Sequence, residues 1–345
     1  MTKRISFYEL TLQDLTEFLQ DLGQPTFRAR QLWQNAYKRL LDNPEEMTDI
    51  PRDLQRRISE TVTFTSLEIR ATARSDDGST EKVLFALPDD QLIEAVLMRY
   101  QRRKTVCIST QVGCAMGCVF CATGQMGLER NLTPGEIVEQ VIYFARYLAN
   151  ENQRMTNLVI MGMGEPFHNY QATMQAIKNL NDPTGFKFGA RRITISTIGI
   201  VPMIKQFAQE NNQVNLAVSL HAATDELRSA LVPINRRYPL DELIPSCKEY
   251  VQQTSRRLTF EWALVHDVND GLDQAQSLVK LIQGLNCHVN LIPLNPTQGY
   301  AGRATSRERV KSFHEFLTKH KIPCTIRMRQ GVDIHAGCGQ LATEK

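Results

Sequence analysis

The sequence lacks a long apolar run, an apolar leader and a large excess of charge. No hydrophobic stretch approaches the roughly 18 residues that cross a bilayer. The N-terminus, Met1-Thr-Lys-Arg-Ile, lacks the apolar core of a signal peptide. We therefore expect a cytoplasmic protein with no membrane partner. The net charge of +3 over 345 residues permits a nucleic-acid partner without demanding one.

Cysteine is also scarce. Eight cysteines in a chain of this length are too few and too unevenly spaced for a secreted disulfide framework. In a reducing compartment they are metal ligands, reactive thiols or small core residues. A hydrophobic content of 42% and a charged content of 22% are those of a globular protein with one large domain or two smaller ones.

Three of the cysteines lie within eight residues, at C-x3-C-x2-C spacing: Cys114, Cys118 and Cys121. A short loop can turn three thiolates towards one point, and thiolates are the ligands of iron–sulfur clusters, where four are usual. A cluster held by three keeps one iron open to a substrate or cofactor. A structural zinc site is the alternative. Zinc sites usually pair two separated knuckles, however, and the nearest downstream histidine is His168. The spacing therefore favours a cluster, with Phe120 before the last cysteine as in radical S-adenosylmethionine (SAM) enzymes.

The periodicity of the chain predicts three regions. Residues 1–60 read as helices: one after an N-cap at Thr11, a second over 27–41 and a third after Pro51. We expect this domain to be either a generic helical cap or an RNA-docking module. Residues 61–104 shift towards a period of two and predict a short β extension or linker.

Residues 105–345 are expected to form the catalytic domain, because strands and helices alternate there as in parallel βα units. Thr133-Pro-Gly-Glu predicts a capped helix start. Six or seven βα repeats suffice for a partial or complete barrel, and we predict the fold class α/β with a partial (β/α) barrel. The expected strands after the cysteine loop are 158–161, 192–196, 215–220, 259–265, 288–293 and 325–328.

Candidate ligand contacts follow these strands, and ligand sites of such barrels form at the carboxyl ends of strands. In the run 161–166, Gly164 lets a ligand approach the backbone and Glu165 can accept bonds from an ammonium group. Polar strand-end groups suit ribose, carboxylate and adenine contacts, although each alone is more often a cap or loop residue. The candidate contact residues at these strand ends are Ser196, Ser219, Leu220, His221 and Asn295.

Two further thiols stand out. Cys338 is flanked by Gly337 and Gly339, which predicts a flexible, exposed thiol, and Cys107 lies in the strand entering the cysteine loop. Two thiols beside a radical-generating cluster suggest covalent catalysis or thiol exchange. Residues 301–330 carry eight Lys or Arg against two Glu, which indicates either a solvated helix face or a phosphate-contacting surface.

Jointly, these motifs resemble the radical SAM RNA methyltransferases that act on adenosine. The resemblance covers nearly the whole chain and rests on the runs 106–124, 130–133, 162–166, 192–197, 219–221 and 337–340. It implies a [4Fe-4S] cluster on the three loop cysteines, two SAM molecules per turnover, and methylation of C2 of a specific adenosine in large-subunit (23S) rRNA and in tRNA. A sister branch methylates C8 of the ribosomal adenosine. A non-catalytic, metal-stabilised RNA-binding protein is the alternative from another class.

The resemblance also implies residue roles. Cys338 takes a methyl group from one SAM, and the cluster reduces a second, releasing a 5′-deoxyadenosyl radical. That radical takes a hydrogen from the S-methyl group, and the resulting carbon radical adds to adenine. Glu94 removes the ring proton, and Cys107 attacks the sulfur of Cys338, leaving a disulfide. Without the resemblance, Glu94 reads as the polar face of a strand. The partners implied are RNA and an electron donor such as flavodoxin or ferredoxin, and nothing demands more than a monomer.

Overall fold

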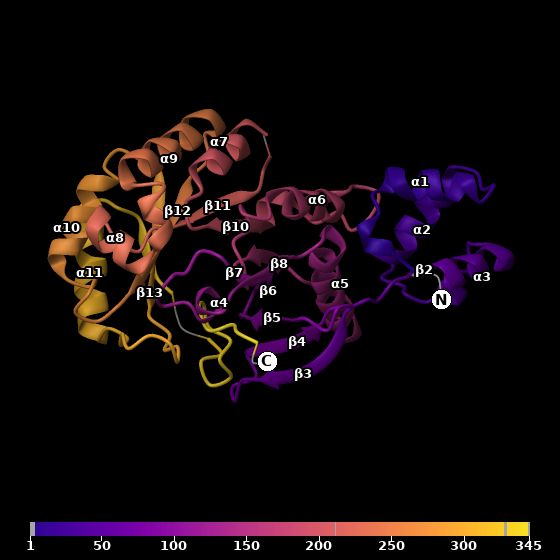
Figure 1. Cartoon of the computed structure of the whole chain (residues 1–345), viewed down its shortest axis with the longest axis horizontal. Coiled ribbons are helices and arrows are strands. Elements are labelled where there is room, and N and C mark those ends of the chain that lie inside the picture. Colours follow the sequence, from indigo (N-terminus) through magenta and orange to yellow (C-terminus); the bar gives the residue numbers. More distant parts are fainter. Residues whose placement is uncertain (1–3, 211, 328–329, 344–345) are drawn as a thin grey trace.

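The computed structural model describes residues 4–210, 212–327 and 330–343. A smaller helical region lies to one side of a larger α/β region (Figure 1). Within the described residues, no helix is long and apolar enough to span a membrane.

The N-terminal region is helical, as the sequence predicts. Thr11 caps the first helix and shares a capping box with Asp14. The second helix ends at Tyr37, short of the expected Leu41, because Leu40 adopts a left-handed backbone conformation (φ 62°) that no helix can continue. The elements are β1 (Ile5–Ser6), η1 (Phe7–Glu9), α1 (Leu12–Asp21), α2 (Phe27–Tyr37), η2 (Pro44–Glu46), α3 (Arg52–Thr61) and β2 (Val62–Thr63).

Aromatic side chains form the core of this region. Phe7 stacks on Phe64 at a centroid separation of 4.7 Å, and Trp33 and Tyr37 lie 4.3 Å apart. Tyr8 meets Phe7 and Tyr37 edge to face. These rings are nearly all fully buried, so they supply most of the apolar area that holds three short helices together.

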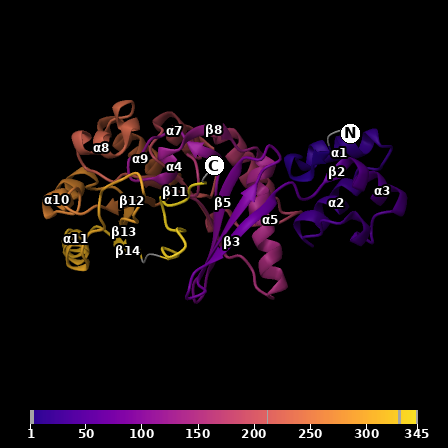
Figure 2. The same ribbon diagram turned by 60° about the horizontal axis from the view of Figure 1, so that its bottom comes forward.

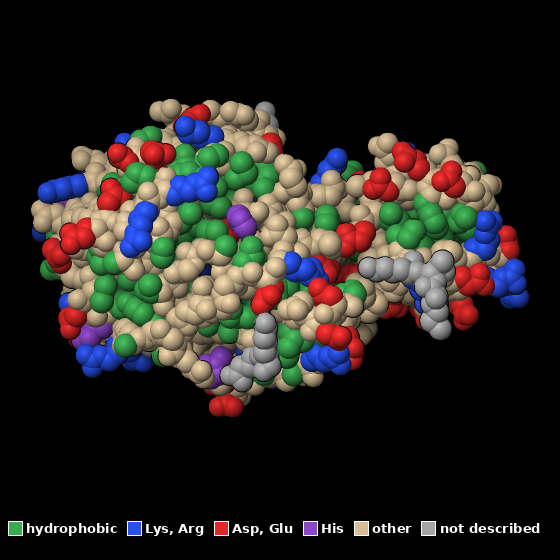
Figure 3. Space-filling model, viewed as in Figure 1, with side chains coloured by type: hydrophobic (Ala, Val, Ile, Leu, Met, Phe, Trp, Pro, Cys, Tyr) green, Lys and Arg blue, Asp and Glu red, His purple; other side chains and the backbone are tan. Residues whose placement is uncertain are grey.

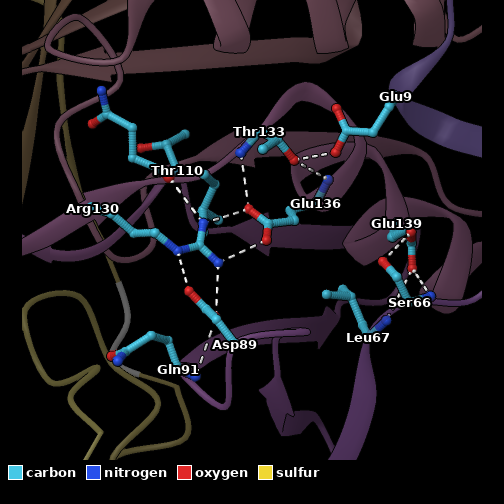
Figure 4. A network of polar contacts seen from close by, with 12 residues as sticks. Glu9, Ser66, Leu67, Asp89, Gln91, Thr110, Arg130, Thr133, Glu136 and Glu139 are labelled. Atoms are coloured by element: carbon cyan, nitrogen blue, oxygen red, sulfur yellow. Dashed lines mark hydrogen bonds and ion pairs between the residues drawn. The ribbon is translucent and has the colours of Figure 1, made fainter. Parts of the chain in front are cut away.

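Carboxylates fix the N-terminal region to α5 (Pro134–Asn150), the first long helix of the α/β region. Glu139 of α5 accepts bonds from the Ser6 hydroxyl, from the Ser66 hydroxyl and N–H, and from the Leu67 N–H (Figure 4). Glu9 accepts a bond from the hydroxyl of Thr133, the N-cap of α5. The contacts lie on both sides of η1 and on the chain leaving β2, so the attachment is rigid.

Within the described residues, the central sheet has ten strands. Its order is β14-β13-β12-β11-β10-β9-β6-β5-β4-β3, and the seven strands from β14 to β6 are parallel. Among the described residues β14 and β3 each have a neighbour on one side only, so the sheet is a partial barrel, as expected. The parallel strands are β6 (Lys104–Ile108), β9 (Asn157–Ile160), β10 (Ile193–Thr197), β11 (Asn215–Ser219), β12 (Leu258–Leu264), β13 (Cys287–Pro293) and β14 (Cys324–Ile326). Met328, the end of the last expected strand, lies outside the described residues.

The β extension belongs to this same sheet. Strands β3 (Glu68–Arg74), β4 (Thr80–Ala86) and β5 (Leu92–Arg99) pair antiparallel, and β5 pairs antiparallel with β6. The sequence indicates the strands but not their partner, because a period of two does not say which edge a hairpin will join. Residues 61–104 thus widen the barrel wall.

Helices follow the parallel strands and cover the outer face of the sheet (Figure 1). Thr133 and Glu136 form the predicted capping box at the start of α5. The others are α6 (Tyr170–Asn181), α7 (Val201–Gln209), α8 (Asp225–Leu231), α9 (Leu240–Thr254), α10 (Leu272–Leu281) and α11 (Arg307–Lys319). This arrangement leaves the carboxyl ends of the strands facing the cysteine loop.

Candidate active site

The cysteine loop is held by a small hairpin that sequence analysis missed. Strand β7 (Gln111–Cys114) pairs antiparallel with β8 (Gly127–Asn131), and a short helix, α4 (Ala122–Gln125), lies between them. Gly113 has φ 72°, and a Cβ there would lie 1.9 Å from the Gly127 carbonyl oxygen. Only glycine fits, so the strand that ends at the first cysteine is fixed by backbone contact.

Arg130 joins this hairpin to the large sheet and to α5. Its guanidinium bonds to both carboxylate oxygens of Glu136, each at 2.8 Å, and to both oxygens of Asp89 in the β4–β5 turn (Figure 4). Paired bidentate contacts of this kind are strong and directional. The motif at 130–133 therefore has a structural role: it sets where the loop sits above the barrel.

A cavity lies between the loop and the strand ends. It is bordered by the cysteine loop, by the carboxyl ends of β9 to β13 and by residues near the C-terminus. Most of the predicted site residues line it together. They are Cys114, Cys118, Cys121, Gly164, Glu165, Ser196, Ser219, His221, Asn295 and Cys338.

The three loop thiols suit an iron–sulfur cluster by chemistry and placement. All three border one wall of the cavity, which leaves its other side free for a group on an open iron. Burial raises the pKa of Cys114 to about 12, so the thiols are neutral until iron displaces their protons. In the described part of the chain, no three His, Cys, Asp or Glu side chains are grouped so that they could hold a single metal ion. In a four-iron cluster each thiolate binds its own iron.

Glu165 is poised for an ammonium group. Its two carboxylate oxygens accept the N–H bonds of Phe167 and Ile198 at 2.9 and 2.8 Å, and each retains a lone pair. Burial raises its pKa to about 7, and a bound cation would favour the ionised form. Gly164 has φ 101°, and a Cβ there would lie 2.6 Å from the Gln111 side chain. The glycine therefore permits both the turn and the close packing.

His221 is held in a strained, defined orientation. Its backbone is left-handed (φ 60°), and its Nδ1 accepts the Ala263 N–H at 3.0 Å. Burial lowers its pKa to about 3, so it is neutral with its proton on Nε2. The ring also meets Phe120 of the cysteine loop edge to face, at 4.9 Å between centroids. Ser196 and Ser219 lie beside each other, with hydroxyls 3.4 Å apart.

Leu220 does not line the cavity. Its side chain is fully buried in the hydrophobic core. Its N–H donates to the Glu261 carbonyl, and its carbonyl accepts from Arg228. Its neighbours in the sequence made it a candidate, but β11 ends at Ser219, and the Leu220 side chain turns into the core while Ser219 and His221 border the cavity.

Cys338 is exposed, as its flanking glycines predict, and the segment that carries it is bound to the cysteine loop. The Gly339 carbonyl accepts the Ala122 N–H at 2.7 Å, and the Leu341 carbonyl accepts the Thr123 hydroxyl at 2.5 Å. Asn295 donates to the Cys338 carbonyl at 3.0 Å, while its own Oδ1 is buried without a partner. That oxygen is free for a ligand donor such as an amino group.

Cys107 lies in a second chamber that adjoins the first. The two chambers share Cys121, Asn295 and Cys338 on their borders, and Cys107 borders only the second. Burial raises the pKa of Cys107 to about 12. The eight cysteines are free thiols, so the disulfide implied by the resemblance is not formed in this structure.

Glu94 is buried, and neither chamber is lined by it. Its carboxylate pairs with Lys82 of β4 at 2.7 Å and accepts the Ala342 N–H at 3.1 Å. Burial raises its pKa, against the opposing effect of Lys82. Glu94 lies on strand β5, as predicted, but this face of the strand is not open to solvent, because the C-terminal segment (residues 330–343) covers this part of the sheet (Figures 1 and 2).

Two residues at the cavity were missed. Glu261 on β12 borders the first chamber and has a buried, unpartnered Oε2. A carboxylate inside the apolar run Phe260-Glu-Trp is a signal that could have found it. Arg327 borders both chambers and so belongs to the site, not to the expected phosphate-binding surface. Arg309 of the same basic stretch is paired with Asp267 and Asp270.

Comparison with known proteins agrees with this site. The model of the radical SAM superfamily matches residues 108–279, and that of the ribosomal RNA large subunit methyltransferase N-terminal domain matches residues 5–64. The chain is 48% identical to the probable dual-specificity RNA methyltransferase RlmN of Chloroflexus aurantiacus, over 97% of this chain and 92% of that one. It is 46% identical to the Staphylococcus carnosus protein of the same name, over 99% and 93% of the two chains.

A solved structure is equally similar. The radical SAM methyltransferase from Sphaerobacter thermophilus superimposes with a TM-score of 0.95 at 51% identity, covering 98% of this chain and 99% of that one. Its similarity extends across both regions of the molecule. The family uses a [4Fe-4S] cluster and SAM, for which the three loop cysteines and the cavity beside them are suited. The chain belongs to the RlmN family of radical SAM RNA methyltransferases.

Proposed function

We propose that the protein methylates C2 of a specific adenosine in large-subunit rRNA and in tRNA through a methylated Cys338. The observation that carries this proposal is the placement of the two extra thiols. Cys338 borders both chambers, one with the three loop cysteines and the other with Cys107. One sulfur can therefore meet a methyl donor on one side and a resolving thiol on the other. The names of the relatives support the RNA classes.

The chain's residues supply binding, proton transfer and thiol exchange. When bound, the cluster and SAM supply a carbon radical, which overcomes the unreactivity of an electron-poor aromatic C–H. Glu165 would hold the ammonium of SAM, and the strand-end groups its ribose, carboxylate and adenine. Those groups are Gly164, Ser196, Ser219, His221, Asn295 and the backbone beside Leu220.

Glu94 and Cys107 act after the methyl carbon has joined the base. Glu94 would remove the ring proton, which requires its carboxylate form. The Cys107 thiol would lose its proton and attack the Cys338 sulfur, forming the S–S bond as the C–S bond breaks; the carbon keeps the electron pair of that bond and takes up a proton to become the methyl group. Glu94 is bonded to the segment that carries Cys338, so movement of that segment would uncover it.

RNA would be held by more than one region. We propose a helical RNA-docking domain at 1–60, a β extension at 61–104 and a catalytic domain at 105–345. On the face shown in Figure 3, basic and acidic side chains are interspersed, which suits recognition of folded RNA by shape more than by one basic patch. We further propose a cytoplasmic monomer reduced by a flavodoxin or ferredoxin, because the RNA classes and low-potential donors are found there.

The test is mass spectrometry of nucleosides from rRNA and tRNA treated with the reconstituted, reduced enzyme. We expect 2-methyladenosine in both RNAs. An 8-methyladenosine product would agree with the thiol chemistry but would show that the methylated carbon is C8 and not C2. Neither product, from a preparation with an intact cluster, would overturn the proposed substrate. A Cys338→Ala preparation is the matched control.

A further inference from the structure

Arg228 of α8 is a fully buried arginine with only neutral partners. Its side chain is 0% exposed. The guanidinium donates to the carbonyls of Leu220 at 3.1 Å and Ile198 at 2.6 Å, and to the amide oxygen of Asn235 at 2.8 Å. Among the described residues, no ion pair joins it to a carboxylate.

This arrangement is costly unless a negative charge lies nearby. A buried cation bonded only to neutral oxygens keeps its hydrogen bonds but loses the hydration that its charge had in water. Proteins therefore pair buried charges or place them beside bound ions. Among the described residues, Asp225 is an acid whose charge acts on Arg228, but its side chain is exposed and forms no ion pair with the guanidinium.

The cysteine loop packs on the same helix. The Val119 N–H donates to the Leu231 carbonyl at 3.1 Å, one turn along α8 from Arg228. The guanidinium also bonds to the Ile198 and Ser219 carbonyls, at strand ends that border the cavity. Arg228 thus lies behind the wall that carries the three thiols.

We propose that Arg228 is the buried counter-charge of the iron–sulfur cluster and raises its reduction potential. This inference rests on the proposed cluster site. Three thiolates outweigh the double positive charge of an oxidised four-iron core, so the bound cluster is anionic. One electron from a reductant such as dithionite adds a further negative charge. A fixed cation in a medium of low dielectric constant stabilises the reduced form more than the oxidised form.

The test is a redox titration of the reconstituted cluster in the absence of SAM and RNA, followed by electron paramagnetic resonance. Arg228→Gln removes the charge and should shift the midpoint potential to more negative values. Arg228→Lys keeps the charge with fewer hydrogen bonds, and its potential should stay near that of the wild type.

Asp225→Asn provides a second variant with an exposed, isosteric change. Asp225 lies on α8 and its charge interacts with Arg228. Removing this acid leaves the arginine less compensated, so the potential should shift in the opposite direction, to less negative values and by a smaller amount. A purely structural arginine predicts no such pair of opposite shifts.

The outcomes separate this inference from the proposed function. Equal potentials in the wild type and Arg228→Gln would overturn it, as would a Lys variant that shifts as far as Gln. If Arg228→Gln does not fold, an unchanged or more negative potential in Asp225→Asn would overturn it instead. Absence of any cluster signal in the wild type would count against the cluster site itself.

Discussion

Cys107 and Cys338 border the same chamber, but Cys107 lies on a strand of the sheet and Cys338 on a loop. Cys107 lies on β6, where both neighbouring strands bond to its backbone and the side chain is buried. The Cys338 side chain is exposed, and the loop that carries it is attached by single bonds, among them those to Ala122, Thr123 and Asn295. One sulfur is fixed and the other can be displaced. A thiol that must first carry a methyl group and then receive attack at sulfur benefits from mobility, whereas its attacker benefits from a fixed position.

The largest effect is expected at the mobile thiol. Cys338→Ala removes the sulfur that we propose carries the methyl group, so methylated RNA should fall to background. The cluster should be retained, because Cys338 is not one of the three loop ligands. The measurement is transfer of labelled methyl from SAM to protein and to RNA. Label on the protein at wild-type level would contradict the role of Cys338.

Substitution of Cys107 should stop the reaction at a later step than substitution of Cys338. Cys107→Ala leaves the methyl transfer intact but removes the nucleophile that releases the product, so RNA should remain covalently attached. Denaturing gel electrophoresis would show a shifted band that contains both RNA and protein. Cys287→Ala, another buried thiol away from both chambers, is the control and should turn over normally. Free, fully methylated RNA from Cys107→Ala would remove its resolving role.

Glu94 lies on β5, next to the strand of Cys107, and bonds to the segment that carries Cys338. Its titration should make the methylation activity depend on pH. Its raised pKa means that acidification protonates it early, so activity should fall as pH drops through that value. Lys82→Met removes a charge that lowers the pKa, and the acid limb should move to higher pH. Glu94→Gln should cost about 10²-fold or more in rate, as loss of a general base does. A pH–rate profile measures both, and an unmoved limb in Lys82→Met would exclude Glu94 as the titrating group.

The smallest effect is expected from loosening the mobile segment. Thr123→Val removes the hydroxyl bond to the Leu341 carbonyl and leaves the three loop cysteines in place. A misplaced reacting group can cost up to about 10²-fold, but bonds from Ala122, Asn295 and Glu94, among others, still hold the segment, so we expect less than tenfold. The rate of single-turnover methylation should fall while Cys338 alkylation by iodoacetamide becomes faster. Slower alkylation would show that the segment is not held by this bond.

Sequence periodicity and caps predicted most of the fold. The Thr11 and Thr133 caps are in place, and the strands and helices of the parallel half fall near their expected positions. Strands β7 and β8 escaped notice because glycine and cysteine give no apolar period, and the hairpin is specified by a backbone contact at Gly113. Which sheet the extension joins depends on tertiary packing, which no local pattern encodes.

The site residues also fall into those that the sequence could predict and those that it could not. Residues on a strand end or in a motif, such as Glu165 and Cys338, could be selected from sequence because their position in the chain sets their position in space. The burial of Glu94 could not, since its cover comes from a segment about 250 residues later, at Ala342. Arg327 and Glu261 were missed because a charge in a basic run or an apolar strand acquires meaning only when the chamber is seen.

Among the described residues, β14 and β3 are the two end strands of the sheet, and the wall of the partial barrel is open between them. The C-terminal segment crosses from β14 towards β3 and β4, where Asp333 accepts the Asp76 N–H at 2.9 Å and the His335 carbonyl accepts from Lys82 at 3.4 Å. Each such surface bond contributes roughly 1 kcal/mol. The distance between the C-terminal segment and strands β3 and β4 can therefore change without breaking the hydrogen bonds between strands. A substrate that displaced this segment would also move Cys338, because the segment carries it.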